Sequence, residues 1–542
     1  MQLREDKFDL VIVGGGITGS GIALDAASRG LKVALIEKAD LASGTSSRSS
    51  KLIHGGLRYL EQFHFSLVRE ALRERKLMLT DTAPHLVRPL PFLFPLEKSR
   101  YRSKSLEKFL ALIGLTLYDL LSGTKSKLPK HQYLTKKQVS EHALSIQTAR
   151  IHGGIRFFDA QVDDARHTMM VARTAAGYGA VIATGVECLQ LMKDGDCVIG
   201  TIVKDLSSGE VFPISAEVVI MASGIWNSQL SKKFGIDISY ELHPSKGVHL
   251  VLDKSSIRSE SGIILKTEKS VLFIIPWESN WIVGTTDTPY QGNLDNPVTE
   301  MNEIEFILEQ ANRVLNPKIS MKDILTTFSG IRPLVSNSIN PETTKISREH
   351  KVDHPNTGLV SISGGKYTTY RIMACDAVNE AQKDLPEHLR NLSSETDKIP
   401  LLGANNLAYF EGKVMELSRD SGLSNTTITH LLKRYGSLIT EILDLVEKRP
   451  QLGSRITQEA EYIKAEVIYA VTHEGARSIQ DILIRRTRLA MELPDFGSSI
   501  SPMIANMIAP GLNWSPERTQ QEVSLYQSEA ANQVKQFRKD EF

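Results

Sequence analysis

A glycine-rich turn close to the N-terminus places the strongest constraint on the fold. Residues 8–13 form an apolar run typical of a buried strand, and Gly14-Gly-Gly16-Ile-Thr-Gly19 follows it directly. Residues 20–29 then show the apolar spacing of a helix. Such glycines allow a tight turn and let the backbone approach a pyrophosphate at the positive end of the helix. The pattern predicts a nucleotide-binding strand–turn–helix, with cofactor contacts from Gly14, Gly15, Gly16, Ile17, Thr18 and Gly19.

An acidic residue after the second expected strand supports this interpretation. The apolar run 32–36 ends in Glu37, about 20 residues past the glycines, where a carboxylate can accept hydrogen bonds from a ribose. The alternative is a glycine-rich turn that binds no nucleotide, and the strand–helix–strand context disfavours it. The motif does not separate FAD from NAD, because both contain an ADP half.

Two later segments favour FAD. Residues 180–187 and 217–226 each join an apolar strand to a glycine turn. They look like the segments that flank the adenine and return the chain to the nucleotide in flavoproteins with two dinucleotide-binding domains, although Ser223 stands where a threonine is usual. We therefore expect Val186 and Gly224 to contact the cofactor.

A polar segment follows the expected ribose-binding acid. Residues 45–51 combine five hydroxyl side chains with two cations, a composition that by itself is usual for a solvated loop. The next residues join a paired-glycine turn to His54, Arg58 and Tyr59. Glycines let a backbone come close to a planar ring, and the polar side chains can then converge on the reacting group. The expected cofactor contacts here are Thr45, Ser46, Ser47, Ser49, Leu52 and Gly55.

Composition excludes several other classes of protein. The 64 basic and 63 acidic residues give a net charge of +1, which argues against a nucleic-acid-binding protein. The three cysteines are too scattered for a disulfide framework or a Cys-x-x-Cys metal or iron–sulfur site, so no metal is expected. No signal peptide is apparent at the N-terminus. The longest mostly apolar stretch, residues 106–121, is shorter than the about 20 residues of a spanning helix. We expect a cytoplasmic protein that does not cross a membrane.

Residues 8–95 and three later segments resemble the corresponding motifs of FAD-dependent glycerol-3-phosphate dehydrogenases of the respiratory, aerobic type. The later segments are residues 281–287, 328–334 and 364–371, and the similarity covers most of the chain in the same order. The run 49–61 is the most specific part, since glycine and sarcosine oxidases share the nucleotide motif but not this run. The resemblance implies an α/β flavoprotein with a Rossmann-like FAD domain, an antiparallel-sheet substrate domain and a helical C-terminal domain.

The expected domains are partly discontinuous in sequence. The FAD-binding domain is expected to comprise residues 1–95, 150–235 and 325–390, and the substrate-binding domain residues 96–149 and 236–324. Residues 400–542 are expected to form the helical domain. A basic run at residues 473–488 of that domain could face a membrane, another subunit or water. Residues 69–83 are interpreted as a solvated helix without chemistry.

The resemblance implies oxidation of sn-glycerol 3-phosphate to dihydroxyacetone phosphate. A base removes the proton of the C2 hydroxyl while the C2 hydride passes to flavin N5, and His54 is the first candidate for this base, with His249 second. Arg58 and Arg332, with Arg348 as a third candidate and Tyr59 beside them, would bind the phosphate, because guanidinium groups match its oxygens. A surface ion pair is the alternative for each arginine.

A second helix start is expected beside the flavin. Lys366, Tyr367 and Thr368 follow the paired glycines 364–365 and precede a helix, so this segment offers positive charge to a reduced flavin. We expect all three residues at the cofactor, with Lys366 also taking a catalytic role.

The electron acceptor and the partners follow from the resemblance alone. Respiratory relatives pass electrons to quinone, which implies peripheral association with the inner face of the cytoplasmic membrane. A basic segment before the apolar residues 109–121 could dock on anionic lipid, although a basic loop before an ordinary core helix is equally compatible. The sequence leaves a homodimer open. The basic residues are Lys98, Arg100, Arg102, Lys104 and Lys108.

Two other functions remain open from the sequence. An oxidase would hand the same electrons to oxygen, and an FAD-binding protein that is not a dehydrogenase would carry out different chemistry. Oxygen consumption with and without quinone separates the first alternative. Reduction of bound flavin by glycerol 3-phosphate separates the second.

Overall fold

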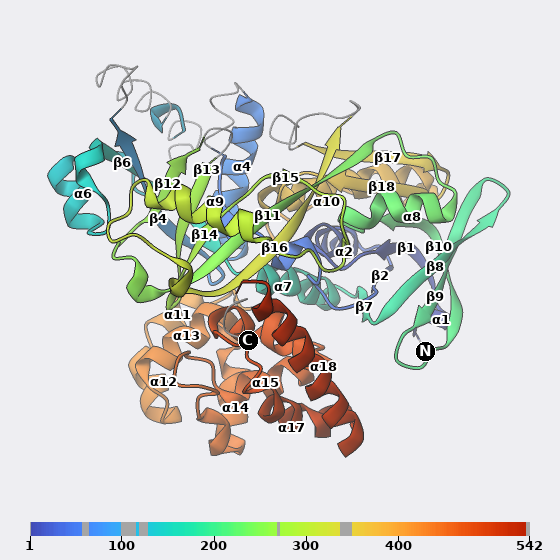
Figure 1. Ribbon diagram of the computed structural model, residues 1–542. Helices are drawn as coiled ribbons and strands as arrows, with labels where there is room; N and C mark the ends of the chain where they lie inside the picture. The colour runs from blue at the N-terminus through green and yellow to red at the C-terminus, as the bar shows by residue number, and fades with distance from the viewer. Residues whose placement is uncertain are drawn as a thin grey trace.

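The computed structural model describes residues 2–56, 64–98, 115–118, 128–267, 271–336 and 349–537. Two β-sheets lie side by side, and a group of C-terminal helices packs beneath them (Figure 1). This arrangement confirms the expected α/β flavoprotein architecture with a helical C-terminal region.

The first sheet is built around parallel strands. Strand β1 (Lys7–Val13) lies between β2 (Val33–Glu37) and β10 (Val211–Met221), and it is parallel to both. Strand β7 (Val181–Thr184) continues the sheet beside β2, and β18 (Leu359–Gly364) continues it beside β10. The remaining strands of this sheet are antiparallel and comprise β8 (Val186–Asp194), β9 (Cys197–Asp205) and β17 (His350–Asn356).

Both faces of β1 are covered, which explains its unbroken apolar sequence. Leu10 and Ile12 pack against a layer of helices, whereas Val11 and Val13 face the arm formed by β8 and β9. The helices of that layer are α2 (Ile17–Ser28), α7 (Asp164–Gly177) and α10 (Tyr370–Ala381).

The second sheet is mostly antiparallel, as expected for the substrate side. Its order is β15-β11-β14-β13-β12-β4-β6-β3, with β16 beside β11 and β5 beside β6. The pair β12–β4 is parallel. Its strands are β3 (Leu52–Ile53), β4 (Val87–Glu97), β5 (Gln132–Thr135), β6 (Ile151–Val162), β11 (Glu241–Asp253), β12 (Gly262–Lys266), β13 (Val271–Trp277), β14 (Asn280–Gly284), β15 (Thr288–Pro289) and β16 (Ile324–Ser336).

Strand membership differs from the expected domain boundaries. Strands β3 and β6, and all but the ends of β4 and β16, fall in ranges expected to belong to the FAD-binding domain, yet all four strands lie in the second sheet. Strand β16 pairs with β11 along nearly its whole length, from Ser336 opposite Glu241 to Ile324 opposite Leu252. The apolar pattern of a buried strand identifies the strand but carries no information on which sheet it joins, so the boundaries could not be read from it.

The C-terminal helices form two apolar cores of their own, one containing Ile482 and Ile504, the other Ile428 and Ile463. This confirms that the C-terminal region is helical. Its helices are α11 (Leu407–Glu411), α12 (Val414–Ser421), α13 (Asn425–Tyr435), α14 (Ile439–Lys448), α15 (Lys464–Thr472), α16 (Leu489–Glu492), α17 (Ser501–Leu512) and α18 (Pro516–Lys535). The other α-helices of the described chain are α1 (Gln2–Glu5), α4 (Phe65–Leu77), α6 (Lys136–His142), α8 (Asn227–Phe234) and α9 (Met301–Asn312).

Helix α4 corrects the expectation of a solvated helix at residues 69–83. Its charged residues Glu74 and Arg75 are buried, the first against Arg371 and the second against Asp159. The partners of Glu74 and Arg75 lie far along the chain. The charge pattern of residues 69–83 alone therefore wrongly indicated that these side chains face solvent.

The expected membrane-docking segment lies mostly outside the described residues. Lys98 is described, and so is the helical turn 115–118, whose Leu115 and Tyr118 are buried in the core beside the second sheet. Within the described parts of the chain, no helix has the length and apolar character to span a membrane.

Candidate active site

The glycine turn adopts the geometry that a nucleotide requires. Gly14 follows β1 directly with a φ of +119°, and a Cβ there would stand 2.7 Å from the Ala222 carbonyl oxygen. A Cβ on Gly19 would overlap the Gly14 carbonyl oxygen, so this position also needs glycine for close packing of turn and helix. Helix α2 begins at Ile17, whose N–H donates to Ser46 Oγ at 2.9 Å.

Glu37 braces this turn from the adjacent strand. Its Oε2 accepts from the Gly15 N–H at 2.7 Å, and its Oε1 accepts from the Ala39 N–H at 2.8 Å. Burial raises the pKa of this carboxyl, and the two backbone N–H groups oppose that rise. Glu37 therefore lies where the sequence predicted, at the carboxyl end of β2 and opposite Thr184 of β7.

Three turns meet at one edge of the first sheet. Gly224 follows β10 with a φ of +57°, Gly14 follows β1, and Val186 begins β8 just after β7. In open α/β sheets nucleotides bind outside the carboxyl ends of the parallel strands. A Cβ on Gly224 would meet open space, whereas one on Gly14 would collide with the backbone of Ala222 and push the two turns apart. The glycines therefore keep the turns close together with open space beside Gly224, an arrangement that fits the ADP half of FAD.

The hydroxyl segment after β2 is held by contacts within the protein. Thr45 Oγ1 donates to the Ile331 carbonyl at 2.7 Å, and Ser46 Oγ receives the N–H at the start of α2. Ser49 donates to Asp164 Oδ2 from both its N–H, at 2.9 Å, and its hydroxyl, at 2.6 Å. The predicted hydroxyls therefore also fix the shape of the loop, a role the sequence analysis did not foresee.

His54 lies where this loop, the second sheet and the start of α10 come together. Its backbone N–H donates to Thr368 Oγ1 at 3.4 Å, and its ring centre is 6.4 Å from that of Phe273 on β13. The pKa of His54 falls to about 4, chiefly because the ring is buried; the positive charges of Lys366 and Arg75 also lower it, and the negative charge of Asp159 opposes them. The imidazole is neutral at pH 7, the state in which it can accept a proton.

Lys366 stands at the start of the turn that leads into α10. Gly364 and Gly365 precede it with φ angles of +82° and +76°, which only glycine adopts readily. Lys366 caps the turn Tyr367–Thr369, so its charge adds to the positive end of α10. The structure thus places Thr368 in a hydrogen bond with His54, and the charge of Lys366 is close enough to act on the His54 ring.

His249 is more deeply placed than His54. It is 2% exposed on β11, stacks on Phe328 with ring centres 4.7 Å apart, and its Nε2 is 2.8 Å from Ser50 Oγ. Burial lowers the pKa of His249 well below its usual value, and Arg332 and Lys51 lower it further. Among the described residues its Nδ1 has no hydrogen-bond partner.

Arg332 lies on the same face of the second sheet as His249. Its Nη2 donates to Thr285 Oγ1 at 3.0 Å and to the Thr286 carbonyl at 3.1 Å, while Nη1 is 3.7 Å from Asp287 Oδ1. The guanidinium is therefore partly buried and partly paired with Asp287. This resembles the ion pair that was the alternative for Arg332, but the pair lies inside the site and not on the outer surface.

The other predicted residues divide into two groups. Arg58, Tyr59 and Arg348 lie outside the described residues. Leu52 pairs with Gln161 in the second sheet, and the Gly55 N–H donates to the Tyr118 hydroxyl at 2.9 Å. The Tyr367 hydroxyl donates to the Asp164 carbonyl at 2.6 Å, so its side chain points into α7 and leaves its backbone for the cofactor.

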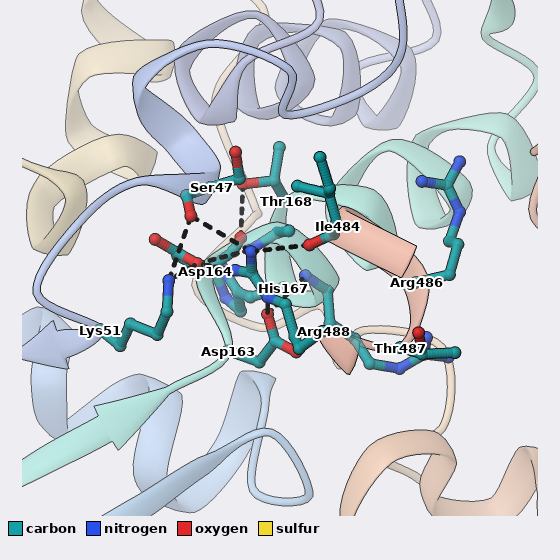
Figure 2. A network of polar contacts seen from close by, with 12 residues as sticks. Ser47, Lys51, Asp163, Asp164, His167, Thr168, Ile484, Arg486, Thr487 and Arg488 are labelled. Carbon is teal, nitrogen blue, oxygen red and sulfur yellow. Dashed lines mark hydrogen bonds and ion pairs between the residues drawn. The ribbon is translucent and has the colours of Figure 1, made fainter. Parts of the chain in front are cut away.

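A buried polar network behind the loop was missed by the sequence analysis (Figure 2). It joins Lys51, Asp163 and Asp164 to Arg488 of the C-terminal helices, and all four side chains are largely shielded from solvent. The adjacent acids 163–164 at the start of an apolar helical run were a visible signal of a helix cap. Nothing in the local sequence indicated their partner.

These groups together define a class of protein. A nucleotide cradle at the edge of a parallel sheet faces a second sheet that carries neutral histidines and cations. Such a site can hold a dinucleotide cofactor, take a proton from a substrate and hold an anion. The fold and site are those of an FAD-dependent oxidoreductase.

Comparison with known proteins narrows this class. Residues 9–371 match the family model of FAD dependent oxidoreductases, and residues 394–519 match the C-terminal domain of alpha-glycerophosphate oxidase. Glycerol-3-phosphate dehydrogenase 2 of Mycobacterium bovis is 45% identical over 98% of this chain and 90% of that protein. The human mitochondrial glycerol-3-phosphate dehydrogenase is 35% identical over 95% of this chain and 72% of that protein.

A solved structure agrees with the sequence relatives. The glycerol-3-phosphate dehydrogenase from Bacillus halodurans, complexed with FAD, superposes with a TM-score of 0.80 and 26% identity, covering 98% of this chain and 96% of that one. The chain belongs to the family of FAD-dependent glycerol-3-phosphate dehydrogenases, and its cofactor is FAD.

Proposed function

We propose that the protein oxidises sn-glycerol 3-phosphate to dihydroxyacetone phosphate. The observation that carries this proposal is the position of His54, neutral and next to Lys366, between the nucleotide-binding sheet and the sheet that carries Arg332. The names of the relatives supply the identity of the substrate. FAD, when bound, supplies the acceptor atom N5 for the hydride that leaves C2.

His54 is the proposed base. It takes the proton of the C2 hydroxyl as the hydride departs, so the alcohol loses two electrons and two hydrogens and becomes a ketone. His54 is partly exposed, whereas His249 is 2% exposed with its Nε2 at Ser50. A negatively charged substrate raises the pKa of His54 from its value of about 4, which makes it a better base in the complex.

Arg332 is the proposed phosphate ligand among the described residues. A quarter of the Arg332 side chain is exposed, while its contacts with Thr285 and Asp287 fix the direction of the guanidinium. Arg58, Tyr59 and Arg348 are proposed to complete the anion site. Lys366 and the backbone around Tyr367 and Thr368 are proposed to stabilise negative charge on the reduced cofactor.

Quinone at the inner face of the cytoplasmic membrane is the proposed electron acceptor, with the protein bound there peripherally. A homodimer is part of the same proposal. An oxidase is the second candidate, because the C-terminal match carries the name of an oxidase. An oxygen electrode decides between them: rapid oxygen uptake without quinone would replace the dehydrogenase proposal.

Substitution of His54 tests the proposed chemistry. We expect His54→Asn to slow anaerobic flavin reduction by at least about a hundredfold, since general base catalysis contributes about 10²–10⁴. His388→Asn is the matched control, because His388 is exposed. Flavin reduction at wild-type speed in His54→Asn would remove His54 from this role.

A further inference from the structure

The C-terminal helices insert a buried basic cluster beneath the cofactor-binding sheet. Arg485, Arg486 and Arg488 are each at most 6% exposed. For these three arginines this corrects the expectation that the basic run 473–488 faces a membrane, another subunit or water, whereas Arg477 of the same run is exposed. Three buried arginines require anionic partners, because an unpaired buried charge is strongly destabilising.

The first two arginines fix the segment that follows Glu37. Arg486 donates to both carboxylate oxygens of Asp40, at 2.8 and 2.9 Å, and Arg485 Nε donates to Asp40 Oδ2 at 2.5 Å. Burial would raise the pKa of Asp40, but the two arginines hold it at about 2. Asp40 lies just before the hydroxyl loop, so this contact anchors one end of it.

Arg488 reaches further, into the loop itself (Figure 2). Its Nε donates to Asp163 Oδ1 at 2.9 Å, its Nη1 donates to the Ser47 carbonyl at 3.2 Å, and its Nη2 contacts Asp164 Oδ1. Its backbone has a φ of +73°, which is unusual for arginine. A conformation of this kind costs about 1 kcal/mol or more and persists only where the surroundings hold it in place.

Asp164, which contacts Arg488, also binds two residues of the loop. Its Oδ2 accepts from the N–H and the hydroxyl of Ser49, and its Oδ1 accepts from Lys51 Nζ at 2.9 Å. Lys51 Nζ also donates to the Ser47 carbonyl at 3.1 Å. One carboxylate, directed by Arg488, therefore holds the loop at two points.

The other side of the loop faces the proposed chemistry. Ser50, between Ser49 and Lys51, meets His249 Nε2 at 2.8 Å. Leu52 and Ile53 then form β3, and His54 follows directly. A shift of the loop would therefore pull Ser50 away from His249, which stays on β11, and would carry His54 and the expected cofactor contacts with it.

We propose that Arg488 is a positioning residue that acts through Asp164 to hold the loop 47–51 against the cofactor and His249. The C-terminal domain thereby completes the flavin site without touching the reacting atoms. This inference rests on the proposed function in one respect only, namely that the loop 47–51 lies next to the bound flavin.

Arg488→Gln in the purified full-length holoenzyme tests the proposal. We expect its FAD dissociation constant to rise about tenfold or more, since a lost hydrogen bond to a charged group commonly has that effect. The visible spectrum of the flavin that remains bound should also shift. Arg488→Lys keeps the charge with a single donor group, so we expect an intermediate dissociation constant; it also serves if the glutamine variant does not fold.

Glu474→Gln is the matched control. Glu474 pairs with Arg166 of α7 in another buried contact between the same two parts of the chain. It also lies 3.9 Å from Arg486 Nε, but Arg486 keeps its two hydrogen bonds to Asp40 without it, and neither Glu474 nor Arg166 contacts the loop through its side chain. We expect it to lower the melting temperature while the FAD dissociation constant stays within about twofold of wild type. Equal loss of FAD affinity in Glu474→Gln and Arg488→Gln would overturn the proposal, as would wild-type affinity and spectrum in both Arg488 variants.

Ser49→Ala distinguishes two ways in which Ser49 could affect FAD binding. Ser49 could relay the effect of Arg488 and Asp164 on the loop, or it could contact FAD directly. If Arg488 acts through Asp164 and Ser49, the Arg488→Gln/Ser49→Ala double variant binds FAD about as weakly as Arg488→Gln alone. Fully additive losses would contradict that path. FAD affinity is measured without substrate, so failure of glycerol 3-phosphate to reduce the wild-type flavin would sink the proposed function and leave this test intact.

Discussion

A methyl group at residue 247 would test the role of Arg332 without changing the arginine. Gly247 lies on β11 opposite Gly330 of β16, and its φ is outside the left-handed region. A Cβ at this position would overlap Arg332 Nη2 and stand 2.5 Å from Thr285 Oγ1. Both atoms are ends of side chains, so Gly247→Ala should turn the guanidinium away while β11 stays folded.

The expected effect follows from the contact that is lost. A charge-assisted hydrogen bond contributes about 1.5–3 kcal/mol, which corresponds to about a 10- to 100-fold loss in kcat/KM for glycerol 3-phosphate. A phosphate held by Arg332 as proposed does not react and is held alike in the ground and transition states, so most of the loss should appear in KM. Steady-state oxidation with an artificial dye acceptor measures both constants.

Gly177→Ala is the control, because a Cβ on this exposed last residue of α7 would meet no atom within 4 Å. The double variant Gly247→Ala/Arg332→Gln should lose little beyond Arg332→Gln alone, since both changes remove one contact. Should Gly247→Ala keep kcat/KM within about twofold of wild type, Arg332 would not bind the phosphate from this position.

Three further outcomes are expected. Gly14→Ala should purify with little FAD, measured as flavin absorbance per protein, because a Cβ there would stand 2.7 Å from the Ala222 carbonyl; full flavin content would contradict the cradle. Arg371→Met should cost about 3–5 kcal/mol of unfolding free energy in urea by leaving Glu74 buried and unpaired, and adding Glu74→Met should recover most of it; a loss below about 1 kcal/mol would mean that solvent reaches Glu74. Burial lowers the pKa of His85 from 6.5 to about 3, so the unfolded state binds its proton first and stability falls as pH drops from 6.5 toward 3. Between pH 7 and pH 5 the unfolding free energy of His85→Gln should therefore fall by roughly 2 kcal/mol less than that of wild type, which appears as a smaller drop in melting temperature. The same pH profile in both proteins would show that His85 is not the group responsible.

The nucleotide half of the site was predictable because its signals are local. Gly14, Gly19 and Glu37 lie within one strand–helix–strand unit, and the turn geometry depends on residues a few positions apart. The start of α10 was predictable for the same reason, since Gly364 and Gly365 need positive φ angles that few other residues adopt.

The contacts that hold the loop were not predictable from local pattern. Arg488 meets Asp164 across 324 positions of sequence, and a basic run on a helix has the same appearance whether it faces water or a buried carboxylate. Glu74 on α4 pairs with Arg371 across 297 positions, so it resembled a solvated residue. Which sheet β16 joins is likewise decided by its pairing with β11, which no single segment contains.

Anaerobic mixing of the FAD-loaded enzyme with sn-glycerol 3-phosphate tests the central claim most directly. We expect the flavin absorbance to bleach and dihydroxyacetone phosphate to form in an amount equal to that of the flavin reduced. Flavin that stays bound and oxidised at saturating glycerol 3-phosphate would contradict it.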